Sequence, residues 1–263
     1  MLQNLRGRCN NTTKDTRMGV SLAVRLAAFT RLSAADREAI EELTAKRQRQ
    51  FAARRDLIRE GDKPRAVFLM LEGWACRYKQ LADGRRQIVA FFIPGDLCDV
   101  NVFILREMDH SIGAINKVRA AEIGRDDFDR LMRDHPRITQ ALYWNELVNM
   151  AIQREWTVDL GQRSAYERLA HLFCELYVRL DTIQLATRQS FEFPLTQADL
   201  ADAMGLTTVH VNRMLRQLRE DGLIEFDRKR LHILDLDRLT RVAMFNANYL
   251  HLDREGRHLD AND

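Results

Sequence analysis

The feature of this sequence that most constrains its fold is a change of period along the chain. Between residues 51 and 123, short runs of β-branched and aromatic residues alternate with turn sequences such as Gly61-Asp62-Lys63-Pro64 and Pro94-Gly95. Runs of this kind are typical of an antiparallel sandwich or barrel. After Pro136 the apolar spacing becomes helical and stays so for a long stretch. The predicted strands are residues 66–71, 74–79, 87–93 and 118–123.

Length, charge and cysteine usage narrow the class of protein. The 263 residues fit two modest domains better than one. A capped helix is predicted over residues 34–43. The formal net charge is only +3, so any nucleic-acid footprint must be local. We find neither a secretory signal nor an apolar run near the ~20 residues of a membrane span, and we expect a cytoplasmic protein that contacts no membrane. The scattered cysteines, Cys9, Cys76, Cys98 and Cys174, predict reduced thiols and no metal site.

The long helix predicted from residue 136 to residue 160 carries two apolar stripes. The first consists of Ile138, Leu142, Val148, Ile152 and Trp156, and the second of Ala141, Leu147, Met150, Ala151 and Val158. One stripe can cover the β domain, and the other favours a partner helix in a homodimer, although a helix buried on two sides of a monomer is an alternative. Gly161 is expected to end this helix, and another is expected over residues 164–180, followed by a loop to residue 190. The residues expected at the dimer interface are Leu142, Leu147, Val148, Met150, Ile152 and Trp156.

The densest pattern lies between Pro194 and Leu218 and predicts two capped helices joined by a tight turn. Thr196 is placed to cap the first helix, whose third residue is Asp199. Gly205 permits a sharp turn because it accepts left-handed backbone angles, and Thr207 is placed to cap the second helix. Helix pairs of this form also occur in enzymes and bundles, so the segments that follow matter.

The second helix of the pair has the character of a DNA-recognition helix. It would bury Val211, Leu215 and Leu218, and no acid lies between Thr207 and Arg219, so phosphates would not repel it from the major groove. A hairpin with a basic tip follows, as expected of a wing over the DNA backbone. The residues expected to contact DNA are Thr196, Thr207, Thr208, Val209, His210, Asn212, Arg213, Arg216, Arg228, Lys229 and Arg230.

This order of parts resembles the Crp/Fnr superfamily of bacterial transcription regulators. The shared motifs include Gly61-Asp62-x-Pro64, Pro94-Gly95-Asp96 and Gly222-Leu223-Ile224, within a match from about Leu43 to Leu239. The resemblance implies an α+β fold with an N-terminal antiparallel β-roll (cyclic-nucleotide-binding-like), a long dimerisation helix and a C-terminal winged helix-turn-helix. It also implies a homodimer on near-palindromic double-stranded DNA, with half-sites ~34 Å apart, and RNA polymerase as a further partner. The expected parts are residues 1–18 (disordered tail), 19–135 (β-roll), 136–160 (dimerisation helix), 161–243 (winged helix-turn-helix) and 244–263 (C-terminal tail).

The chain departs from the family where cyclic-AMP-binding members hold the phosphate. Those members use a Gly-Glu pair after the Pro-Gly-Asp turn and an Arg-Ser pair further on. Here Asp99 and Val100 take the first two places, and His110 and Ser111 take the others. An added acid and a lost arginine disfavour a cyclic phosphodiester, so we expect a degenerate pocket without tight cyclic-AMP binding.

Other sensing devices of the family are also incomplete. Iron–sulfur members carry an N-terminal cysteine cluster, whereas this chain offers only Cys9 there. A carbon-monoxide-sensing branch ligates haem with a cysteine and a histidine near the position of Cys98, but the nearest downstream histidine is His110. We expect no cofactor and a buried Cys98, with haem or thiol-based sensing as alternatives.

The recognition helix suggests an altered half-site. Many family members carry a glutamate two residues before the hydrophobic position and an arginine two residues after it. Arg213 matches the arginine and is expected to contact guanine O6 and N7, whereas Val209 replaces the glutamate and could touch a thymine methyl.

The main rival hypothesis is a β-roll ligand-sensing module that acts through protein–protein contacts. An enzyme is disfavoured, because no nucleophile–base pair and no catalytic residue stands out. Translation starting at Met18 is a further hypothesis.

Overall fold

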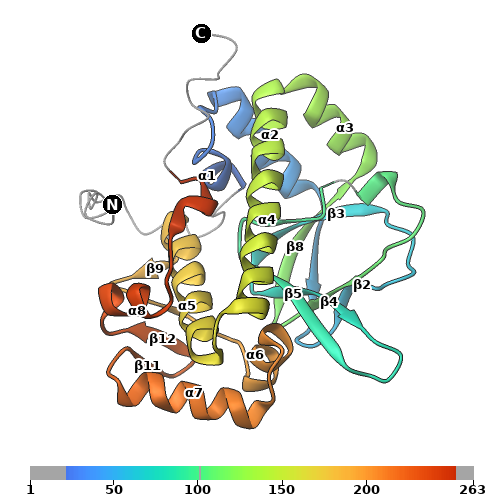
Figure 1. Cartoon of the computed structure of the whole chain (residues 1–263). Helices are drawn as coiled ribbons and strands as arrows, with labels where there is room; N and C mark the ends of the chain where they lie inside the picture. Colours follow the sequence, from blue (N-terminus) through green and yellow to red (C-terminus); the bar gives the residue numbers. More distant parts are fainter. Residues whose placement is uncertain (1–21, 101, 253–263) are drawn as a thin grey trace.

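The N-terminal half is a roll of two antiparallel sheets (Figure 1). The computed structural model describes residues 22–100 and 102–252 of the chain. The first sheet has the order β1 (Gln48–Phe51), β8 (Val118–Gly124), β3 (Ala66–Glu72) and β6 (Leu97–Cys98). The second has the order β2 (Asp56–Ile58), β7 (Ser111–Ala114), β4 (Ala75–Gln80) and β5 (Arg86–Phe92). The predicted antiparallel β-roll is therefore confirmed.

Helices cover the roll on one side. They are α1 (Leu22–Leu26), α2 (Ala34–Lys46), the 3-10 turn η2 (Val102–Ile104), α3 (Arg125–Asp134) and α4 (Pro136–Gln162). Ser33 caps α2 through a reciprocal pair with Asp36. The helix α4 continues through Gly161, where we expected it to end. A single glycine costs a helix only ~1 kcal/mol, and the break comes instead at Ser164, which caps the next helix.

The C-terminal half contains a helix-turn-helix and a small sheet. Its elements are α5 (Ala165–Thr182), β9 (Ala186–Thr187), β10 (Ser190–Glu192), α6 (Gln197–Met204), α7 (Thr208–Glu220), β11 (Ile224–Asp227), β12 (Arg230–Ile233), α8 (Leu236–Val242) and the 3-10 turn η3 (Ala247–Leu250). The expected loop to residue 190 contains β9, and the sheet has four strands in the order β11-β12-β10-β9. The extra strands form because β10 pairs with β12 and buries Phe191 completely.

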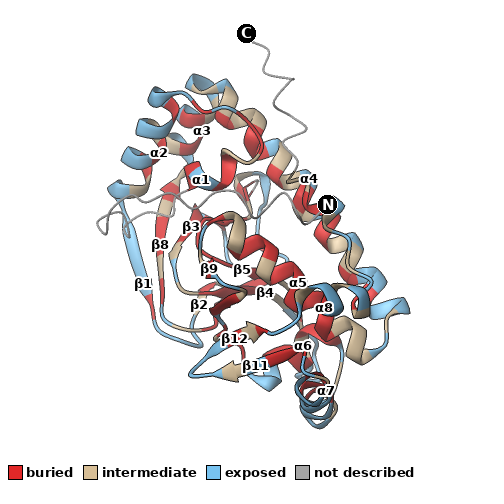
Figure 2. Ribbon diagram, turned by 90° about the vertical axis from the view of Figure 1, so that its left-hand side faces the viewer, coloured by how far each residue is buried: buried red, intermediate tan, exposed pale blue. Residues whose placement is uncertain are grey.

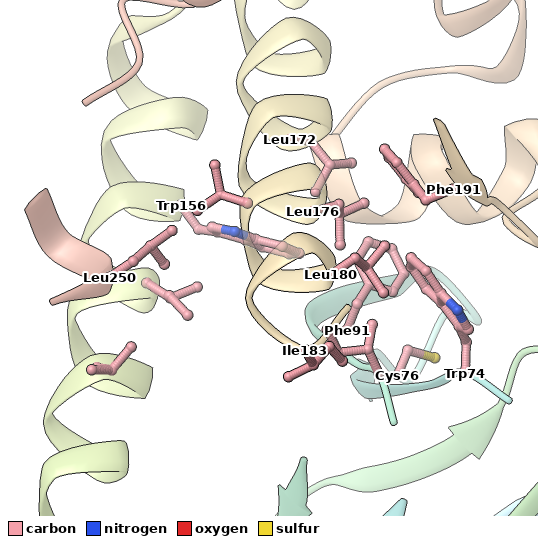
Figure 3. Packing of buried hydrophobic residues seen from close by; sticks show 14 of the residues in the cluster. Trp74, Cys76, Phe91, Trp156, Leu172, Leu176, Leu180, Ile183, Phe191 and Leu250 are labelled. Carbon is pink, nitrogen blue, oxygen red and sulfur yellow. The ribbon is translucent and has the colours of Figure 1, made fainter. Parts of the chain in front are cut away.

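One hydrophobic core runs through both halves of the molecule (Figure 3). Phe91 of the roll contacts Trp156 of α4 with ring centroids 5.8 Å apart. Trp74 of the roll contacts Phe193, just before α6, at 6.4 Å. Buried residues occupy most of the length of α5 (Figure 2). The position of the C-terminal half relative to the roll is therefore fixed by apolar packing.

A buried polar network reinforces this packing. Asp96, in the Pro-Gly-Asp turn, pairs with Arg25 of α1 at 2.5 Å and with Arg179 of α5 at 2.9 Å. Arg179 also pairs with Glu175 at 3.1 Å, and Glu175 accepts a hydrogen bond of 3.2 Å from the Tyr249 hydroxyl. The chain after α8 thus contacts α5 through Tyr249. The expected N-terminal tail, including Cys9 and Met18, and residues 253–263 lie outside the described residues.

Candidate nucleic-acid interface

The two caps and the turn of the helix-turn-helix form as predicted. Thr196 Oγ1 accepts a hydrogen bond of 3.2 Å from the Asp199 amide, and Asp199 Oδ2 accepts one of 2.9 Å from the Thr196 amide. Gly205 ends α6 with φ of 64°, in the left-handed region. Thr207 Oγ1 accepts a hydrogen bond of 3.2 Å from the His210 amide. The hydroxyls of Thr196 and Thr207 are thus already engaged within the protein.

The helix α7 divides cleanly into a buried and an exposed face. Val211, Met214, Leu215 and Leu218 are buried. The outer face presents side chains to solvent, among them the apolar Val209, which is 79% exposed. Because the amino-terminal end of a helix carries partial positive charge, this end of α7 suits a phosphate. Thr208, Asn212, Arg213 and Arg216 are exposed as well, and His210 is half-buried.

The hairpin after α7 has a basic tip. The residues Arg228 and Lys229 form a two-residue turn with φ of 44° and 64°, between the paired residues Asp227 and Arg230. The Arg228 side chain is 92% exposed. Arg230 differs from these two cations, because its Nε donates a hydrogen bond of 3.1 Å to Ser190 Oγ of β10.

One exposed residue on the helix pair was missed from the sequence. Gln197, in the first turn of α6, accepts a hydrogen bond of 3.3 Å from Asn212 Nδ2 of α7. The sequence pattern that could have indicated it is the cap at Thr196, because this cap puts Gln197 in the first turn of α6.

The helix pair is also tied directly to the β-roll. Arg54, after β1, forms a two-pronged ion pair with Asp199 of α6, at 2.5 and 2.8 Å. Arg86 of β5 pairs with Asp202 at 2.8 Å and with Asp199 at 3.3 Å. Burial alone would raise the pKa of Asp199, but hydrogen bonds from Arg54 and Thr196 hold that pKa below its ordinary value of 3.8.

Charged side chains of the protein occupy the expected ligand pocket of the roll. Asp99 forms ion pairs with Arg77 and with His110 Nε2, the latter at 2.8 Å. Val100 is buried, and Ser111 Oγ accepts a hydrogen bond of 2.9 Å from the Glu60 amide. A separate space between the roll and α4 is about 20 Å³, enough for one water molecule, and its lining includes Arg77 but none of Asp99, Val100, His110 and Ser111.

Cys98 lies inside the roll rather than at an accessible site. It is buried in a small core cluster with Phe68 and Met70. Burial, together with the negative charge of Asp99, raises the pKa of its thiol well above the ordinary value of 9.0. A protonated, enclosed thiol is unreactive. Among the described residues, no group of three or more His, Cys, Asp or Glu side chains is placed to hold a metal ion.

Only part of the expected dimer surface lies on the outside of α4. Leu147 and Met150 are exposed, at 56% and 55%. We expected six residues to face a partner, and this is corrected for four of them, which are buried within a single chain. These buried residues are Leu142, Val148, Ile152 and Trp156. The apolar stripe that remains outside also contains Tyr143 and Val158.

The exposed face of α7, which carries no acid before Glu220, lies beside a basic hairpin, and this arrangement defines a winged helix-turn-helix DNA-binding protein. A family match agrees with this class, because residues 167–242 match a Crp-like helix-turn-helix domain. Residues 48–135 match a cyclic nucleotide-binding domain. No helix in the described ranges is long and apolar enough to cross a membrane.

Relatives in sequence identify the family, and a solved structure shares the fold. A probable transcriptional activator of Rhizobium leguminosarum bv. viciae is 30% identical over 197 residues, which cover 74% of this chain and 80% of the relative. The nitrogen fixation regulation protein FixK of Bradyrhizobium diazoefficiens is 29% identical over 84% of this chain and 92% of its own length. The structure of FixK2 from Bradyrhizobium japonicum has the same fold, with a TM-score of 0.67, 23% identity and coverage of 76% of this chain and 98% of that one. The chain belongs to the Crp/Fnr family of DNA-binding transcription regulators.

Proposed function

We propose that this chain is a homodimeric regulator that reads a near-palindromic DNA site through α7 and acts in the cytoplasm, where that DNA lies. The observation that carries the proposal is the outer face of α7, where Val209, Asn212 and Arg213 are exposed and no acid precedes Glu220. An arginine on such a face can hold guanine O6 and N7 together.

The experiment that tests this proposal is selection of duplexes from a random library by the purified protein, followed by a salt titration. A DNA reader gives one recurrent sequence and an affinity that falls steeply with salt, because bound counterions are released. The rival, a β-roll module acting through protein contacts, gives neither a recurrent sequence nor a salt slope. A near-palindrome among the selected duplexes supports the dimer, and a single unrepeated half-site contradicts it.

We place the dimer interface on the exposed stripe of α4. Tyr143, Leu147 and Met150 recur at helical spacing of four and three residues, and exposed apolar stripes of this kind pair between helices. We expect Leu147→Glu or Met150→Glu to shift the protein to monomer in sedimentation velocity. Leu81→Glu is the matched control, because Leu81 is equally exposed at 53% but lies on the roll.

We also propose that the protein works without a cyclic nucleotide. The support is the pairing of Asp99 with Arg77 and His110, which puts a carboxylate and its partners where the family resemblance places the phosphate. Isothermal titration with cyclic AMP is expected to show no heat of binding, and micromolar affinity would refute the proposal. RNA polymerase is the further partner we propose, since one relative bears the name of a transcriptional activator.

A further inference from the structure

Side chains of the β-roll bind α6, the first helix of the helix-turn-helix, near both of its ends. Near the amino-terminal end of α6, both Nη atoms of Arg54 donate hydrogen bonds to the Asp199 carboxylate. In the middle, Arg86 Nε donates to Asp202 Oδ2 at 2.8 Å. At the carboxyl end, Gln87 Nε2 donates a hydrogen bond of 3.0 Å to the carbonyl of Ala203. An eight-residue helix held at three points has little freedom to tilt.

Arg54 and Arg86 are themselves held by further contacts within the roll. Arg54 has a left-handed backbone with φ of 64°, and its amide donates a hydrogen bond of 2.9 Å to the Ala114 carbonyl of β7. The Arg86 guanidinium lies 5.1 Å from the centre of the Tyr78 ring, which adds a cation–π contact. Asp199, on the other side, is only 1% exposed, whereas Arg54 is 45% and Arg86 28% exposed, so the carboxylate is shielded from solvent and the two guanidinium groups are partly open to it.

The grip on α6 determines where α7 lies. The two helices are joined through the Gly205 turn, where the Leu206 amide donates a hydrogen bond of 3.1 Å to the Ala201 carbonyl. Gln197 and Asn212 add a contact between the two helices at 3.3 Å. The DNA-facing side of α7 stays exposed in this arrangement, so the docked position leaves the recognition surface free.

We propose that Arg54 and Arg86 are positioning residues for DNA recognition, which fix α7 relative to the roll and thereby set the spacing between the two recognition helices of the dimer. This inference rests on the homodimer proposed above. Neither arginine touches DNA in this role. They act through Asp199 and Asp202. Their contribution to DNA affinity is expected only when the two recognition helices of the dimer bind both half-sites at the same time.

The test compares Arg54→Ala and Arg86→Ala with Arg85→Ala. Arg85 is the matched control because it neighbours Arg86 but pairs with Asp83 in its own hairpin. The probes are the duplex that the wild-type protein selects from a random library, one half of that duplex, and versions with the half-sites moved apart by one or a few base pairs. We expect about tenfold weaker binding of the full duplex by the two variants, with half-duplex binding unchanged and less discrimination of spacing. Arg85→Ala is expected to behave as wild type.

Charge reversal provides a second variant. Arg86→Asp should weaken full-duplex binding, and Asp202→Arg in the same chain should restore it, because the pair re-forms with opposite sense. Tighter full-duplex binding by Arg54→Ala or Arg86→Ala would overturn the proposal, since the grip would then be holding α7 in an unproductive position. Equal loss on full and half duplexes would overturn it as well.

A readout without DNA separates this proposal from that of the dimer. Spin labels on cysteines introduced at Leu81 and Gln217, in a Cys9→Ser background, report the distance from the roll to α7. Arg54→Ala and Arg86→Ala are expected to broaden this distance distribution, and an unchanged distribution would refute the positioning role. If the wild-type protein binds full and half duplexes equally, the dimer proposal fails, whereas the distance measurement still decides the role of the arginines.

Discussion

Arg179 of α5 donates a hydrogen bond of 2.9 Å to Asp96 in the turn between β5 and β6, and both side chains are more than nine-tenths buried. Breaking a buried pair of this kind leaves one charge without a partner, which typically costs about 3–5 kcal/mol. We expect Arg179→Met to destabilise the protein by this order in urea unfolding. The double variant Arg179→Met, Asp96→Asn should cost less than the sum of the single changes, and strict additivity would contradict direct coupling.

The pair formed by Asp99 and His110 predicts a pH-dependent stability. Although burial favours neutral imidazole, hydrogen bonding and attraction to Asp99 raise the pKa of His110 above 6.5. Burial likewise opposes the Asp99 carboxylate, but His110 and Arg77 lower its pKa below 3.8. The contribution of the histidine is complete below pH 6.5 and is lost as the pH rises through its raised pKa. That of the aspartate is complete above pH 3.8 and is lost as the pH falls through its lowered pKa.

The corresponding measurement is the free energy of unfolding of the wild type and of His110→Gln. We expect the wild-type advantage to be larger near pH ~5.5 than near pH ~8, because the imidazolium is the stabilised form. Asp109 also faces the imidazole, with 2.6 Å to Nδ1, so Asp109→Asn should reduce the effect without removing it. An advantage that grows toward alkaline pH would show that the pair is not ionic.

Arg213 is expected to read a base. Arg213→Ala should cost ~1–3 kcal/mol of binding and relax preference at one position of each half-site. Arg241→Ala on α8, also an exposed arginine, serves as the control, with binding and base preference close to wild type. Unchanged specificity of Arg213→Ala in the selection experiment would remove Arg213 from the recognition surface.

The tip of the hairpin is expected to contact phosphates only. Because Arg228 and Lys229 are exposed, replacing either by alanine should weaken binding of all sequences alike and lower the slope of log affinity against log salt by about one. Arg230→Ala should have a smaller effect, since its guanidinium already donates to Ser190. A change in sequence preference would instead indicate that the wing reaches into a groove.

The local parts of the candidate site could be predicted from the sequence, whereas its long-range contacts could not. Caps and glycine turns such as Thr196 and Gly205 depend on a few neighbouring residues, so their patterns are readable. The strand β1 reads Gln48-Arg49-Gln50-Phe51 and has no apolar alternation, because pairing with β8 rather than its own burial makes it a strand.

The sequence does not separate the exposed apolar stripe of α4 from the buried one, for a similar reason. Both stripes are apolar, and only the packing against the roll shows that Trp156 faces inward while Leu147 faces solvent. The ion pair between Arg54 and Asp199 joins residues 145 positions apart, and each carries an ordinary surface-type side chain. Nothing in the sequence around either residue indicates its partner.

The core that runs unbroken from Trp74 to Phe193 also limits how the protein can be divided. A fragment containing only the DNA-reading half would present a bare apolar face, and a hybrid built by joining this half to another regulator's roll would lack matching rings. We therefore expect the two halves to fold as one cooperative unit, so that a functional exchange would have to replace both halves or change both sides of their contact together.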